Sequence, residues 1–263
     1  MLPCPIGGGE SISLHVVKVY KHMGRKTIPT GGILPELTAR HGAAAAATRR
    51  IRRLLFSKST VAYDKKLTVG NALVLSKDLY GAGAWPEMNT TEECRLHANV
   101  SGLFRTALGE GFVDDDTPLI TDVLLYNTYE LRTPLTFVRF ARLRLSVRIV
   151  QFATFDLLAL LFAAKGDPRS WLKALEGDLV WLAKVVGTQW TPREWFTLCR
   201  SDPKLARRTV RKACESDEGR RVSLSQLSTP VQRMAASFSC PCGKVCRSKA
   251  AYAAHQASVR TQV

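Results

Sequence analysis

The chain has 263 residues, enough for one large domain or two modest ones with hydrophobic cores. Its 46% hydrophobic and 23% charged residues are typical of a globular protein, and no low-complexity tract exists beyond the alanine run at 43–47. Lys and Arg number 38 against 22 Asp and Glu, so the formal net charge is +16, which favours nucleic acid or an anionic membrane surface as partner.

Neither a membrane span nor a secretory signal is predicted. The longest apolar run, Leu157–Ala164, is much shorter than the ~20 residues that cross a bilayer. The N-terminal sequence MLPCPIGGGE has no basic region followed by an apolar one. The seven cysteines are scattered, except for Cys240, Cys242 and Cys246. We therefore expect an intracellular protein, nuclear or cytoplasmic and not secreted, with reduced thiols and no membrane partner.

A short β-structure and then a helix are the first elements predicted. The β-branched run ISLHVVKVY predicts a strand over Ile12–Tyr20, and glycines and a proline after it indicate a hairpin or loop. Pro35 suits the first turn of a helix with one apolar side and one basic side. Such a basic face suits a phosphate backbone, although a merely solvated face is the commoner outcome. The apolar side comprises Leu37, Ala44, Ala47, Ile51, Leu54 and Leu55, and the basic side comprises Arg49, Arg50, Arg52 and Arg53.

Two amphipathic helices joined by a glycine-rich corner are predicted between Leu67 and Leu108. Gly81 and Gly83 end the first helix, and Thr90 with Glu93 has the spacing of a capping box that begins the second. The apolar residues are Leu67, Val69, Ala72, Leu73, Leu75, Leu79 and Tyr80 in the first helix, and Leu96, Val100, Leu103, Phe104, Ala107 and Leu108 in the second.

Further helices are predicted from capping residues followed by proline, at Thr117, Thr133, Thr191 and Asp202. Ser170 caps another helix, in which leucines repeat at near-heptad spacing and around which tryptophans cluster. A basic helix then carries Lys204, Arg207, Arg208, Arg211 and Lys212, and the polar, turn-rich residues 215–235 are interpreted as a linker.

No catalytic constellation is predicted. The run Asp114–Asp116 could hold magnesium ions only on a tight turn between strands, whereas Thr117 and Pro118 after it indicate a helix start. The histidines have no Cys or Ser partner that the sequence places beside them. We therefore expect no Mg site, no small-molecule substrate and no enzymatic activity of this chain alone.

The C-terminal segment has features of a zinc finger. Cys242 is followed by twelve residues and then His255, a spacing that brings a hairpin thiolate and a helical imidazole to one zinc ion. Cys240 completes a candidate set of three ligands, with Cys246 as a possible fourth. Only one residue separates Cys240 from Cys242, and Arg260 stands where a second histidine is expected. Zinc binding and a relic finger without zinc both remain open.

Taken in order, these parts resemble the C-terminal half of a non-LTR retrotransposon reverse transcriptase. The run VVKVYKHMG resembles that family's primer-grip hairpin, and LTVGNALVLSKDLYGAGAW resembles its thumb. The run SWLKALEGDLVWL resembles the region after the thumb, and the tail resembles the terminal finger. The resemblance covers nearly the whole chain. It implies a β-hairpin remnant of a palm at 1–34, a thumb-like helical bundle at 35–110, a post-thumb helical region at 111–214, and a degenerate zinc-finger-like segment at 236–260.

The resemblance implies a mainly α protein with an N-terminal β-hairpin, a thumb-like bundle, a second helical layer and a small ββα C-terminus. The palm aspartates that hold catalytic magnesium have no counterpart in this chain. We therefore expect a retroelement-derived fragment of an RNA-directed DNA polymerase that binds RNA, DNA or an RNA–DNA hybrid through its basic helical faces. A nucleic-acid-binding zinc-finger protein of the two-Cys, two-His type is one alternative. Part of an active polymerase whose N-terminal half is missing is another.

Overall fold

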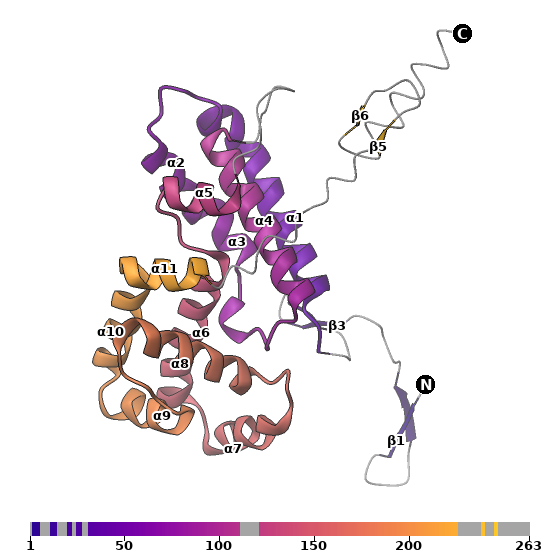
Figure 1. Cartoon of the computed structure of the whole chain (residues 1–263). Helices are drawn as coiled ribbons and strands as arrows, with labels where there is room; N and C mark the ends of the chain where they lie inside the picture. The colour runs from indigo at the N-terminus through magenta and orange to yellow at the C-terminus, as the bar shows by residue number, and fades with distance from the viewer. Residues whose placement is uncertain are drawn as a thin grey trace. The chain divides into compact units, whose positions relative to one another are not determined.

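The protein is mainly helical, as the sequence predicts (Figure 1). The computed structural model describes residues 31–110 and 121–224 with their side chains, and only the backbone of Ser225 and of six short strands. The chain divides into two compact units, Met1–Leu224 and Ser225–Val263.

The strands form three separate antiparallel pairs. The predicted strand over Ile12–Tyr20 is described only at its two ends, which belong to different pairs, and residues 15–19 lie outside the described part. The pairs are β1 (Leu2–Pro5) with β2 (Ser11–Leu14), β3 (Tyr20–His22) with β4 (Arg25–Thr27), and, in the second unit, β5 (Phe238–Ser239) with β6 (Val245–Cys246).

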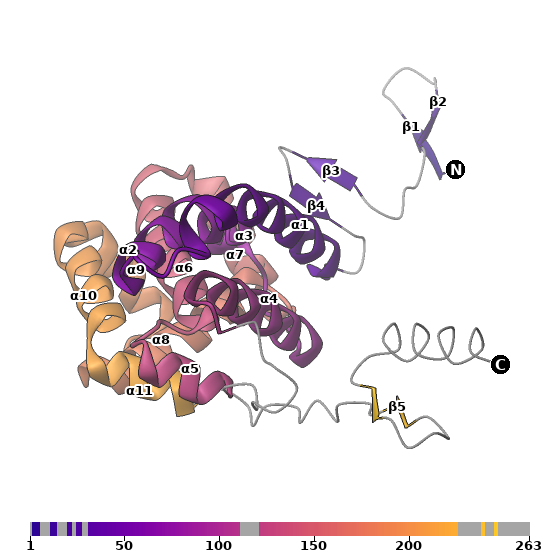
Figure 2. The same ribbon diagram turned by 90° about the horizontal axis from the view of Figure 1, so that it is seen from above.

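The first group of helices packs around two long, adjacent helices (Figure 2). Helix α1 packs against both α3 and α4, and α2 packs against α4. The group consists of α1 (Leu34–Ile51), the π-helical turn η1 (Arg52–Phe56), α2 (Tyr63–Gly70), the π-helical turn η2 (Asn71–Leu75), α3 (Ser76–Asp78), the 3-10 turn η3 (Ala82–Ala84) and α4 (Thr90–Leu108).

The two π-helical turns correct part of the predicted apolar faces. A π turn holds more residues than an α turn, so the residues within and after it rotate relative to the core. Leu54, predicted to face the core, is 79% exposed, and Phe56 is buried in its place. Leu73, also predicted to face the core, is 51% exposed, while Val74 is buried. In α4, which has no such turn, the predicted apolar residues are buried except the half-buried Leu108.

The start of α4 is held by a buried carboxylate. The capping box is formed by Asn89 and Glu92, one residue before the predicted pair of Thr90 and Glu93. Glu92 also accepts a hydrogen bond from the backbone N–H of Ile33 at 2.7 Å, just before α1. It accepts a further one from Arg169 at 2.6 Å. One side chain therefore fixes the beginnings of two helices and a distant loop.

The glycine-rich corner between the two predicted helices lies directly on helix α6 (Pro134–Phe152). Gly81 has a φ of +75°, a left-handed conformation that suits glycine after a helix end. The carbonyl oxygen of Gly83 accepts a hydrogen bond from Trp171 Nε1 at 2.7 Å. Trp85 is completely buried next to this corner in the sequence. The corner therefore joins the first group of helices to the second.

The second group of helices surrounds α6 and α8 (Trp171–Val186). Helix α6 contacts α8, α9 and α10. Trp181, Trp195 and the leucines of α8 are buried in the core of this group, as predicted. The other members are α7 (Phe155–Ala163), the 3-10 turn η4 (Ala164–Gly166), α9 (Pro192–Ser201), α10 (Pro203–Glu215) and α11 (Asp217–Ser225). Helix α5 (Asp122–Thr128) lies instead against α4 of the first group, where the buried Tyr126 hydroxyl forms a hydrogen bond with Ser101 at 3.1 Å.

Most of the predicted helix starts in this group are confirmed. The side chains of Thr133, Ser170 and Asp202 each accept a hydrogen bond from a backbone N–H in the first turn. Thr191 does the same, and its predicted capping box with Glu194 is present. Thr117 lies outside the described residues.

The predicted linker at 215–235 is partly wrong. Residues 217–225 form α11 instead. Ser223 is completely buried and accepts hydrogen bonds from Thr136 on α6 and Trp181 on α8. The polar sequence did not indicate this helix, because its main buried contact is made by a small hydroxyl group rather than by a large apolar side chain.

Candidate nucleic-acid interface

Helix α10 has a buried apolar side and an exposed basic side. Its inner side consists of small or branched residues that pack on α6, α8 and α9. All five of its cationic side chains are exposed, and none forms an ion pair with an acid among the described residues. The buried set is Ala206, Val210, Ala213 and Cys214, and the exposed set is Lys204, Arg207, Arg208, Arg211 and Lys212.

The predicted arginines of the first helix lie at its C-terminal end. Arg49 and Arg50 occupy the last turn of α1 and are exposed, and Arg53 in η1 is exposed as well. Arg52 is half-buried. Cations in the last turn of a helix are stabilised by the negative end of the helix dipole. These arginines therefore have a structural reason to be where they are.

The structure does not bring the two basic clusters together. Helix α1 packs with α3 and α4, whereas α10 packs with α6, α8 and α9. In Figure 1 the end of α1 lies near α2, and α10 lies in the other group of helices. A single groove lined by both clusters is therefore not formed, and each has to be considered as a separate surface.

Two of the four arginines of α6 are withdrawn from solvent. Arg142 Nη1 donates to Asp178 Oδ2 of α8 at 2.8 Å, and Arg139 Nε lies 3.7 Å from the other oxygen of that carboxylate. Burial is the largest influence on the pKa of the Asp178 carboxyl and raises it above its usual value, although the two guanidinium groups oppose this effect. These three charges form a buried bridge between α6 and α8 and do not contribute to an interface.

The other two arginines of α6 are exposed and were not singled out from the sequence. Arg144 and Arg148 lie one turn apart, and Phe152 follows at the same spacing. Arg207 of α10 reaches this side of α6, where it donates to Gln151 Oε1 at 2.5 Å. Periodicity alone could have grouped the three α6 residues, but only the packing of α6 shows that their side of the helix faces solvent.

The predicted zinc ligands Cys240, Cys242 and His255 lie outside the described residues, as do Asp114–Asp116. No group of His, Cys, Asp and Glu that could hold a metal ion occurs in the part of the chain that is described. Burial raises the pKa of the Cys199 and Cys214 thiols to about 12, so neither is a nucleophile at neutral pH.

One histidine does lie near a carboxylate. His41 Nδ1 is 3.7 Å from Asp78 Oδ1, which is too far for a hydrogen bond. Burial raises the pKa of Asp78 to about 7, and burial followed by the charge of Arg95 lowers the pKa of His41. His41 Nδ1 has no hydrogen-bond partner among the described residues, so the pair lacks the hydrogen bond that joins histidine to carboxylate in a catalytic triad.

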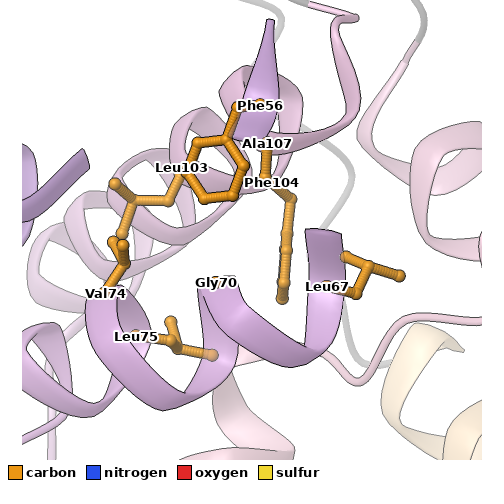
Figure 3. Close-up of a pocket in the computed structure, with 8 residues that line it drawn as sticks. All are labelled: Phe56, Leu67, Gly70, Val74, Leu75, Leu103, Phe104 and Ala107. Atoms are coloured by element: carbon orange, nitrogen blue, oxygen red, sulfur yellow. The ribbon is translucent and has the colours of Figure 1, made fainter. Parts of the chain in front are cut away.

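A small apolar cavity lies between α2, η2 and α4 (Figure 3). Its volume is about 10 Å³, which is near the minimum for one water molecule. The rings of Phe56 and Phe104 and several aliphatic side chains form its walls, so it lacks the polar groups that would orient a ligand. The remaining wall residues are Leu67, Gly70, Val74, Leu75, Leu103 and Ala107.

Across the described segments, no helix is both long and apolar enough to span a membrane. Comparison with known proteins finds no match: no protein family, no curated protein and no solved structure resembles this chain significantly. Function therefore has to be inferred from the surface chemistry of the described residues.

Proposed function

We propose that this chain binds nucleic acid and that the exposed side of α10 is its main contact surface. The observation that carries the proposal is the absence of ion-pair partners for the α10 cations within the described part of the chain. Cations that no acid neutralises raise the local concentration of a polyanion, and phosphate contacts dominate the affinity of such proteins.

The distribution of charge along α10 supports this proposal over a structural explanation. Lys204, Arg207 and Arg208 lie in the first half of the helix. The positive end of the helix dipole disfavours a cation in the first turn, where Lys204 lies, and the dipole does not stabilise the other two. The helix dipole therefore accounts for the arginines of α1 but not for these three. Asp202 caps α10 and is the acidic group that its N-terminus requires.

The resemblance to non-LTR retrotransposon reverse transcriptases supports the same proposal. On this basis the N-terminal β-structure derives from a palm, the first group of helices from a thumb, and the C-terminal segment from a ββα zinc finger. The chain would then hold RNA, DNA or an RNA–DNA hybrid without joining nucleotides, because polymerisation requires carboxylates that hold two metal ions.

The test is a titration of fluorescein-labelled RNA–DNA hybrid with the full chain, followed by fluorescence anisotropy at several salt concentrations. We expect affinity to fall as salt rises, because binding releases counterions from the phosphate backbone. The double variant Arg208→Glu/Arg211→Glu should bind more weakly. The slope of log affinity against log salt should fall by about 0.7–0.9 for each phosphate that the variant no longer neutralises.

A control variant with the same change in net charge separates a defined surface from general attraction. Lys65 on α2 and Lys77 on α3 are exposed, and Lys65→Glu/Lys77→Glu reverses two charges away from α10. Equal weakening by the two double variants would contradict a contact surface on α10. No binding by the unmodified chain at low ionic strength would remove the proposed function altogether.

A further inference from the structure

Two phenylalanine rings are exposed where α6 ends and α7 begins. Phe152 is 78% exposed and Phe155 is 83% exposed, although large apolar side chains normally lie in a core. None of the residues of α7 is buried, and Leu157 and Leu160 are also exposed. An exposed apolar patch on one short segment, as here, is typical of a binding surface.

Cationic groups adjoin this patch from two helices. Arg144, Arg148 and Phe152 occupy successive turns of one exposed stripe of α6. From α10, Arg207 Nη2 donates to Gln151 Oε1 at 2.5 Å, directly beside Phe152 in the sequence. The basic side of α10 therefore contacts α6 at the residue before the exposed Phe152.

This combination selects the kind of partner. A second copy of the chain, with a net charge of +16, would bring like charges together at this surface. A purely apolar partner would leave the guanidinium groups without a counterpart. A nucleic-acid strand with unpaired bases supplies both an aromatic face for each ring and a phosphate for each cation. In a duplex the base faces are stacked on one another and cannot reach the rings.

We infer that the junction of α6 and α7 is a stacking platform for single-stranded nucleic acid, a deduction that rests on the proposed nucleic-acid binding and specifies its substrate. Phe152 and Phe155 stack against successive unpaired bases. Arg148 and Arg207 neutralise the phosphates of the same strand. Readout of this type is tolerant of base sequence, because every base has a π-face.

The experiment compares a labelled deoxythymidine oligonucleotide with a labelled duplex of equal length, by fluorescence anisotropy. For Phe152→Ala/Phe155→Ala we expect binding of the single strand to weaken about tenfold or more, because stacking is worth ~1–3 kcal/mol per base and tenfold is ~1.4 kcal/mol. Binding of the duplex should not change. Both rings are exposed, so their removal leaves the core intact.

Two further double variants serve as controls. Leu157→Ala/Leu160→Ala removes exposed apolar groups of the same helix but no ring, and it should leave single-strand affinity unchanged. Phe152→Tyr/Phe155→Tyr keeps the rings and should retain affinity. Removal of the rings should also leave the salt slope unchanged, whereas Arg148→Gln should lower it by about 0.7 for a single strand.

The possible outcomes separate this inference from the proposed function. If the unmodified chain binds both probes and the phenylalanine variant binds the single strand equally well, the platform is refuted while the proposed function stands. An equal weakening by the leucine variant would show that general apolar contact, and not ring stacking, supports single-strand binding, which also refutes the platform. Failure of the unmodified chain to bind either probe would refute both.

Discussion

Gly83 offers the sharpest test of how the two groups of helices are joined. It lies in the 3-10 turn η3, which packs directly on α6. A Cβ atom added at Gly83 would lie 2.6 Å from the carbonyl oxygen of Ala141 and 2.9 Å from its carbon. Both are backbone atoms of a helix, so they cannot move aside as a flexible side chain could.

The cost of Gly83→Ala follows from these distances. Because ordinary contacts of a Cβ begin near 3.4 Å, α6 or the corner must shift by several tenths of an ångström. Overpacking of this kind costs about 1–3 kcal/mol. The shift also disturbs the hydrogen bond from Trp171 to Gly83, worth about 1 kcal/mol. Replacing glycine restricts the unfolded chain and offsets about 0.4–1 kcal/mol. We expect a net destabilisation of about 1–3 kcal/mol.

The assay is urea denaturation followed by far-UV circular dichroism, with Gly102→Ala as the matched control. Gly102 is an exposed position in α4 where an added Cβ would meet no atom within 4 Å apart from its chain neighbours and the nearby backbone of its own helix. There the same substitution should stabilise the protein by about 0.5–1 kcal/mol, because alanine favours a helix. A Gly83→Ala variant as stable as the unmodified protein would refute the close approach. So would an equal destabilisation by both variants.

Two further substitutions test the buried charges. Asp178→Ala leaves Arg139 and Arg142 buried without their counter-charge and should destabilise the protein by about 3–5 kcal/mol in thermal denaturation, whereas a change below about 1 kcal/mol would contradict the bridge. Burial raises the pKa of Asp78 from 3.8 to about 7, so over that interval the folded state holds a proton that the unfolded state has released. This contribution to stability therefore falls as pH rises from about 4 to about 7. Asp78→Asn should remove this dependence and be more stable than the unmodified protein at about pH 8, by at most about 4 kcal/mol. If the urea midpoints of the unmodified protein and of Asp78→Asn respond to pH identically, the raised pKa of Asp78 is contradicted.

Local signals predicted the second group of helices well. Two helix starts, at Ser170 and at Thr191 with Glu194, depend on hydrogen bonds between residues only three positions apart. The sequence specifies such contacts directly. The leucine repeat of α8 likewise fixed its buried face. By contrast, the capping box of α4 begins at Asn89 rather than Thr90. Both residues can cap a helix, and the choice depends on the distant partners of Glu92.

The apolar faces of the first group were predicted less well. The helical period used for Leu54 and Leu73 holds only while the helix remains an α-helix. The π-helical turns η1 and η2 each add a residue to one turn, and this addition rotates the two leucines away from the core. No local pattern in the sequence predicts such a turn, because packing against α4 determines which residue faces the core.

The sequence by itself determined the net charge, the helical class and the basic side of α10, because charge is a sum over residues and the face of a regular helix follows from residue spacing. Only the tertiary structure decided which cations are available to a partner. Arg142 and Arg148 lie on the same helix, yet the first is buried against Asp178 and the second faces solvent. That difference arises because α8 covers one side of α6 and leaves the other open, a contact between segments more than thirty residues apart that residue spacing within α6 does not encode.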